Sequence, residues 1–122
     1  MNKTLCALVA VASLWASGAH AMTVREFLTM ADRIPRNASA LLRSDTRSLM
    51  NELKTAFQTV RTEQAAAQAA GRRPATCIPE GKISKSPDAV LERFNAIPAQ
   101  RRSISVTHAV REWMAEEHPC PV

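Results

Sequence analysis

The chain has 122 residues, only 4% of them aromatic, and a formal net charge of +5 at neutral pH. This length suits one small domain with a core of its own and excludes a multidomain architecture. Positive charge can attract nucleic acid, but the few aromatic residues, the lack of a binding motif and the export signal described next argue against that class of partner.

Residues 1–21 have the pattern of a secretory signal peptide. One basic residue, Lys3, precedes an apolar run of about fifteen residues, and an A-x-A site for cleavage follows at 19–21. The run is short for a membrane span, which needs about 18 or more apolar residues. Cleavage after Ala21 is therefore expected, and an uncleaved anchor is the alternative. The processed chain, residues 22–122, would be a single periplasmic domain of formal charge +4 without a membrane span.

Cleavage would leave two cysteines, Cys77 and Cys120, because Cys6 lies in the signal peptide. Exported proteins meet oxidising conditions, so two remaining cysteines usually pair. We therefore expect a disulfide between them. Two alternatives use the same residues. A zinc site could add His108 and His118, although the usual paired ligand spacing is missing, and a catalytic thiol would need one cysteine to stay free.

The first expected helix begins after Thr23. Thr23 and Glu26 fit a capping box, in which the threonine hydroxyl accepts a hydrogen bond from a backbone N–H of the first turn. The apolar residues of this helix share one face: Phe27, Leu28, Ala31 and Ile34. Pro35 ends the helix, and a short helical turn is expected over residues 38–43.

The longest helix is expected to begin at Ser44 or Asp45 and to end before Gly71. Its apolar residues recur with a helical period that a strand does not have: Leu49, Met50, Leu53, Ala56, Phe57 and Val60. Residues 63–70 are rich in alanine and glutamine, which favours helix but buries little surface. Gly71 is a suitable C-terminal cap, and Pro74 prevents continuation.

A turn at residues 77–81 separates the long helix from the next one. Ser86 is expected to be the N-cap of that helix, with Pro87 at its first position and Asp88 in its first turn, where an acid interacts favourably with the helix dipole. The apolar face of this helix consists of Val90, Leu91 and Phe94. The dipeptide Ile97-Pro98 ends it.

The last helix is expected to begin near Ser103 or Ser105 and to end at His118. Its core-facing residues are predicted to be Val106, Ala109, Val110, Trp113 and Met114. Each of the four main helices carries one aromatic residue, and these four are expected to meet in a single core: Phe27, Phe57, Phe94 and Trp113. The predicted fold class is therefore all-α, a small domain of four to five helices stapled by one disulfide.

The sequence contains no recognisable catalytic motif. The serine-hydrolase, zinc-protease and phosphate-loop patterns are all missing, so we predict a protein that is not an enzyme and that needs neither a metal nor another cofactor. Glu116, Glu117 and His118 place two acids beside an imidazole. Without a nucleophile or a metal cluster nearby, they are interpreted as a solvated helix end.

Basic residues are the main candidates for contact with a partner. Three of them recur every seven residues on the polar side of the long helix, and two basic pairs lie further along the chain. A basic face can meet an acidic protein or steer its association. Ordinary solvation of a charged face is the alternative. The candidate residues are Arg47, Lys54, Arg61, Arg72, Arg73, Arg101 and Arg102.

Residues 74–121 combine a C-I-P-E-G turn at 77–81, an amphipathic helix, and a second helix that runs into Pro119 and Cys120. This pattern resembles that of the Rap/Tai immunity proteins, in which a C-[IL]-P-x-G turn precedes a helix and a second helix closes on a proline-cysteine pair. The resemblance implies a small, helical, exported periplasmic protein whose paired cysteines are Cys77 and Cys120. It also implies a partner, because family members bind and block cell-wall amidases delivered by type VI secretion.

The expected function is that of a periplasmic immunity protein that binds and blocks a secreted cell-wall-degrading effector, such as a peptidoglycan amidase. The alternative is a periplasmic stress chaperone that binds unfolded proteins in acid. Protonation of the carboxylates would leave that chain strongly positive and favour its opening. A homodimer is a further alternative that the sequence leaves open.

Overall fold

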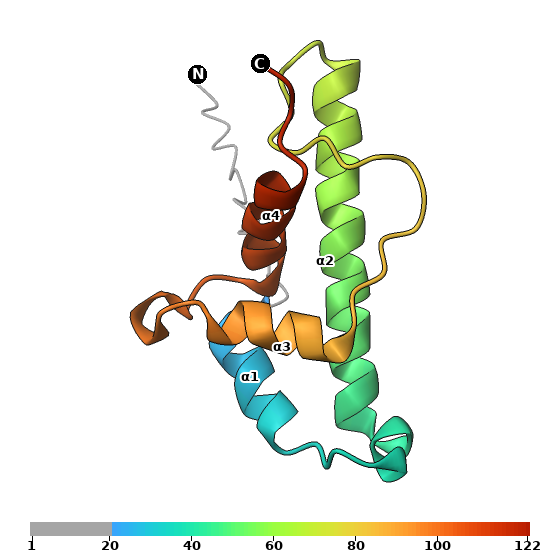
Figure 1. The fold of residues 1–122 in the computed structure, drawn as a ribbon, viewed down its shortest axis with the longest axis vertical. Coiled ribbons are helices and arrows are strands. Elements are labelled where there is room, and N and C mark those ends of the chain that lie inside the picture. The colour runs from blue at the N-terminus through green and yellow to red at the C-terminus, as the bar shows by residue number, and fades with distance from the viewer. Residues whose placement is uncertain (1–20) are drawn as a thin grey trace, which may run out of the picture.

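The structure, a computed structural model, describes residues 21–122. The expected signal peptide therefore lies outside the described residues except for Ala21. The described part forms four α-helices and two short 3-10 helices, and it contains no β-strand beyond one isolated bridge between Thr23 and Ser105 (Figure 1). The predicted all-α class with one disulfide is confirmed.

Helix α1 (Val24–Asp32) and the 3-10 helix η1 (Ala38–Leu42) form the N-terminal part of the fold. Thr23 caps α1 as predicted, because its hydroxyl oxygen accepts a hydrogen bond of 3.1 Å from the Glu26 N–H. The helical turn expected over residues 38–43 is confirmed and is of the 3-10 type.

Helix α2 (Ser44–Ala69) is the long axis of the molecule, and the other three α-helices lie to one side of it (Figure 1). It ends as predicted: Gly71 has a φ of +68°, and the Arg72 N–H donates to the Ala67 carbonyl at 2.8 Å.

One member of the apolar face predicted for α2 is wrong. Met50 is 61% exposed, whereas Leu49 is buried. Neighbouring residues on a helix point about 100° apart, so the neighbour of a buried residue can fall outside the apolar face. Met50 instead lies on the polar side, three residues after Arg47 and four before Lys54.

Helix α3 (Pro87–Asn95), the 3-10 helix η2 (Ala99–Arg101) and helix α4 (Val106–Glu117) complete the fold. Both α-helices begin where the sequence predicts. Ser86 and Ser105 are their N-caps, and each serine hydroxyl accepts a hydrogen bond from the N–H three residues later, at 3.1 and 3.0 Å.

The core lies between α2 and α4 and is completed by residues of α1 and α3. The four aromatic residues meet there as predicted, in two pairs: Phe27 and Phe94 lie edge to face with their centroids 5.1 Å apart, and Phe57 and Trp113 are tilted at 6.2 Å. All five residues expected to face inward from the last helix are buried. Within residues 21–122, the core extends from Met22 to Met114.

Candidate functional site

The connection between α2 and α3 contains no helix or strand, yet it is fixed to the body of the protein at several points. Cys77 is the first. Its sulfur is bonded to that of Cys120, with the two Cα atoms 4.9 Å apart, and its N–H donates to the His118 carbonyl at 2.9 Å. The predicted disulfide is confirmed, and because both sulfurs are used in it, neither cysteine can be the zinc ligand or free thiol considered as alternatives.

Gln64 of α2 is the second point of attachment. Its side-chain oxygen accepts hydrogen bonds from the Ile78 N–H at 2.8 Å and from the Thr76 hydroxyl at 3.0 Å, and its side-chain nitrogen donates to the Ile78 carbonyl at 3.0 Å. Thr76 and Ile78 are both buried. Buried polar groups need such partners, so one amide satisfies three groups that would otherwise have none. The sequence carries no signal for this role of Gln64, because an alanine- and glutamine-rich stretch such as residues 63–70 is expected to bury little surface.

Arg61, one helical turn before Gln64, holds the next stretch. Its guanidinium donates to the carbonyls of Pro79, at 3.4 Å, and of Gly81. The backbone of Gly81 has a φ of +112°, a conformation that side chains rarely adopt. This glycine and the arginine beneath it together set the path of the chain over α2.

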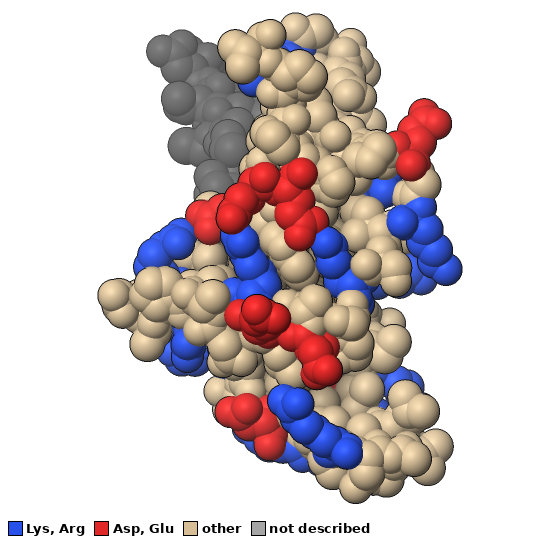
Figure 2. All heavy atoms as spheres, viewed as in Figure 1, with Lys and Arg blue, Asp and Glu red and all other residues tan. Residues whose placement is uncertain are grey.

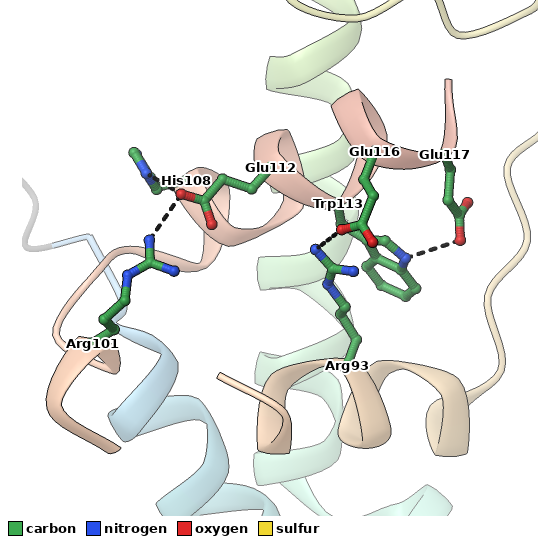
Figure 3. Close-up of polar contacts among 7 residues, drawn as sticks. All are labelled: Arg93, Arg101, His108, Glu112, Trp113, Glu116 and Glu117. Atoms are coloured by element: carbon green, nitrogen blue, oxygen red, sulfur yellow. Dashed lines mark hydrogen bonds and ion pairs between the residues drawn. The ribbon is translucent and has the colours of Figure 1, made fainter. Parts of the chain in front are cut away.

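Lys85 fixes the end of the connection to α4. Its Nζ lies 2.6 Å from a carboxylate oxygen of Glu117 and 5.0 Å from the centroid of the Trp113 ring. The indole N–H of Trp113 donates to the other oxygen of Glu117 at 2.9 Å (Figure 3). The hydrogen bond from Lys85, with its positive charge, lowers the pKa of Glu117 below its usual range.

Between these attachments the connection is exposed to solvent. Residues 79–82 are all exposed, and the connection stands away from α2 (Figure 1). A shallow hollow lies beneath it, lined by residues 78–85 with Arg61 and His118. We call residues 77–85 the braced loop. It presents an exposed tip, residues 79–82, on a backbone that is already fixed.

The seven basic residues predicted to meet a partner fall into two groups in the structure. Four of them make hydrogen bonds or ion pairs within the fold. Arg61 holds the braced loop, Arg73 donates to the Cys120 carbonyl at 3.1 Å, and Arg101 pairs with Glu112 at 2.9 Å. Arg102 donates to the carbonyls of Ile97 and Asn95 at 2.9 and 3.0 Å, at the C-terminal end of α3 and just after it. The side chains of Arg47, Lys54 and Arg72 make no hydrogen bond or ion pair within residues 21–122. A role for any of the seven in partner binding stays a prediction.

The exposed side of α4 carries carboxylates that each have a basic partner. Arg93 of α3 lies 2.6 Å from Glu116 (Figure 3). Glu112 accepts from both Arg101 and His108, at 2.9 and 3.1 Å. The interpretation of residues 116–118 as a solvated helix end agrees with the exposure of both glutamates at the end of α4. Their ion pairs were not part of that prediction, and they join α4 to α3 and to the braced loop.

A bidentate ion pair joins α2 to α4. Both oxygens of Glu63 accept from the Arg111 guanidinium, each at 2.7 Å, and this hydrogen bonding lowers the pKa of Glu63.

The pKa of Glu112 is lowered as well. Burial alone would raise it, but the hydrogen bonds from Arg101 and His108 outweigh the effect of burial.

These lowered values predict that acid destabilises the protein. A carboxylate whose pKa is lower in the folded state contributes stability above its ordinary pKa, about 4.3, and loses that contribution as the pH falls through the lowered value. Because the glutamates are partly exposed, we expect the free energy of unfolding to fall by only about 1–2 kcal/mol between pH 5 and pH 3. Urea denaturation at a series of pH values measures this. Glu63→Gln should reduce the pH dependence, and a stability that is unchanged or higher at pH 3 would contradict the assignment.

Within residues 21–122, no group of three histidine, cysteine, aspartate or glutamate side chains is placed to hold a metal ion. No helix of the described part is both long and apolar enough to cross a bilayer. Comparison of the chain with protein-family models, with curated proteins and with solved structures found no match. The likeness to the Rap/Tai proteins therefore rests on the sequence pattern of residues 74–121.

Proposed function

We propose that this is an exported immunity protein that binds a secreted cell-wall-degrading effector in the periplasm and blocks it with the tip of the braced loop. The observation that carries the proposal is the combination of an exposed tip with a backbone that is held by Cys77, Gln64, Arg61 and Lys85. A loop fixed before binding loses little conformational entropy when it binds, which favours tight association with a folded partner.

Sequence pattern and geometry support the same element. The C-I-P-E-G turn, on which the likeness to the Rap/Tai proteins rests, occupies residues 77–81, which are the first five residues of the braced loop. Its cysteine forms the disulfide, its isoleucine is buried, and its glutamate is exposed at the tip. The first two residues thus anchor the loop, the glycine permits its turn, and the exposed Glu80, at the position that the pattern leaves open, is free to vary with the partner. The disulfide also suits an oxidising compartment, in agreement with the proposed export.

A second candidate, an acid-activated chaperone, is supported by the three glutamates with lowered pKa. Their protonation would loosen the attachment of α4 to α2, α3 and the braced loop, and so expose apolar surface. The two candidates differ in the partner and in the pH. An immunity protein holds one folded enzyme at neutral pH, whereas a chaperone holds many unfolded chains in acid.

The test begins with affinity capture on the oxidised processed chain, using secreted and periplasmic extracts of the source organism at pH 7 and pH 4. We expect one wall-degrading enzyme to be retained at pH 7 and its hydrolysis of peptidoglycan to be inhibited at a fixed stoichiometry. The double variant Glu80→Ala/Lys82→Ala, which changes only the tip, should weaken inhibition at least about tenfold.

The matched control is Asp32→Ala/Arg33→Ala, which removes the same two charges at the far end of α1, where both side chains are exposed. It should inhibit like the unchanged protein. Retention of many unrelated proteins at pH 4 alone would favour the chaperone. A retained enzyme that stays active, or equal loss in the two double variants, would contradict blocking by the loop tip.

A further inference from the structure

The connection between α1 and α2 carries two neighbouring exposed leucines. Leu41 is 73% exposed and Leu42 is 82% exposed, and η1, which contains them, buries none of its residues. Among large hydrophobic residues of the described chain, only Met50 and the C-terminal Val122 are also exposed. The connection forms one end of the molecule, opposite to the end where the C-terminus lies (Figure 1). Exposed apolar groups that lie together commonly mark a contact surface.

Arginines flank these leucines. Residues 33–50 contain Arg33, Arg36, Arg43 and Arg47 but a single acid, Asp45, which gives this stretch a net charge of +3. Asp45 pairs with Arg43 at 3.2 Å. Arg36 lies 3.7 Å from Asp88, but the side chains of both are at least 80% exposed, so this pair leaves the guanidinium accessible. The lower end of the molecule in Figure 2 is mostly uncharged surface, with basic side chains and an acidic one at its border.

We propose that this end, which we call the dileucine tip (Leu41 and Leu42 with the four flanking arginines), docks on the surface of an anionic lipid bilayer. Leucine side chains can enter the boundary between headgroups and acyl chains, while arginines contact the lipid phosphates. The tip contains both the leucines and the arginines that this interaction needs, and they are near each other in the sequence.

The shape and the charge favour a bilayer over other occupants. A second copy of the chain would bring like charges together at the same surface, which is unfavourable. The hollows of the surface that are described lie elsewhere, beneath the braced loop and along the polar side of α2. The tip is a projecting end of the molecule (Figure 1), and a projecting end with leucines fits a deformable planar surface.

This docking leaves the braced loop accessible. Ser44, the first residue of α2, follows the tip directly, and Arg61 is seventeen residues further along the same helix. At 1.5 Å per residue, Arg61 lies about 26 Å from the start of α2. A protein bound to a bilayer through its dileucine tip could thus present the braced loop to a partner in solution. The lipid proposal does not depend on the proposed function.

The test is co-sedimentation of the oxidised processed chain with vesicles of 30% phosphatidylglycerol in phosphatidylcholine and with vesicles of phosphatidylcholine alone. Binding is expected only to the anionic vesicles, and 0.5 M salt should abolish it because it screens exposed charges. Leu41→Ser/Leu42→Ser should lower the partition coefficient about tenfold, and Arg36→Gln/Arg43→Gln should lower both binding and its dependence on salt. Val122→Ser, at the opposite end of the molecule, is the matched control and should bind normally.

The melting temperature of each variant shows whether it is folded, and because the replaced side chains are exposed we expect little change. Failure of the unchanged protein to bind anionic vesicles would overturn the proposal, as would equal binding of the Leu41→Ser/Leu42→Ser and Val122→Ser variants. If analytical ultracentrifugation shows a dimer that the leucine variant alone converts to a monomer, and vesicles are not bound, the tip is an interface between copies and the lipid proposal is wrong.

Discussion

Removal of the disulfide between Cys77 and Cys120 is expected to lower the melting temperature of the processed chain by more than about 10 °C. The bond joins residues 43 positions apart. In the chain-entropy model, closing a loop of this length stabilises the folded state by about 4 kcal/mol, an upper figure because residual structure in the unfolded chain reduces it. A small domain has only about 5–15 kcal/mol of net stability, so the loss is a large share of it.

The measurement is thermal unfolding of Cys77→Ser/Cys120→Ser, followed by circular dichroism for the helices and by the fluorescence of Trp113 for the core. The double replacement avoids a leftover thiol that could pair between molecules. The unchanged protein in excess reductant is the control and should melt with the variant. Unchanged melting temperatures in both would mean that Gln64, Arg61 and Lys85 hold the loop without the covalent bond, and the stabilising role assigned to the disulfide would be wrong.

Most helix boundaries could be predicted because their signals are local. Thr23, Ser86 and Ser105 each satisfy a backbone N–H three residues away, so the cap depends on the sequence within one turn. Gly71 ends α2 for a similarly local reason, its positive φ. Met50 was misplaced because periodicity gives the direction of an apolar face but does not decide which of two adjacent apolar residues lies at its edge.

The candidate site was predictable only in part. The two cysteines could be paired from the compartment alone, since no other cysteine remains in the processed chain. Gln64 and Arg61 could not be assigned to the loop, because their contacts join segments 12 to 20 residues apart whose approach is decided by packing. The spacing of seven residues predicts that Arg61 lies on the same side of α2 as Arg47 and Lys54. It does not predict that the loop crosses this side of the helix at Arg61 and not at the other two residues.

The replacement Gln64→Ala is expected to lower the free energy of unfolding by about 2–4 kcal/mol. It removes the partners of the Ile78 N–H, the Ile78 carbonyl and the Thr76 hydroxyl at once. Thr76 is 2% exposed and Ile78 is 5% exposed, so water cannot readily replace the amide. Each buried polar group left without a partner costs about 1–3 kcal/mol. Urea denaturation of the variant and of the unchanged protein measures the difference.

The same helix offers a matched control. Gln68 is exposed, and Gln68→Ala should change the stability by no more than about 0.5 kcal/mol. Gln64→Glu separates the accepting from the donating role, because a carboxylate can still accept from the Ile78 N–H and the Thr76 hydroxyl but cannot donate to the Ile78 carbonyl. At neutral pH its stability should therefore lie between those of Gln64→Ala and the unchanged protein. Equal stabilities of the Gln64→Ala and Gln68→Ala variants would show that water satisfies the loop, and the fixed backbone on which the proposed blocking of a partner depends would lose its main support on α2.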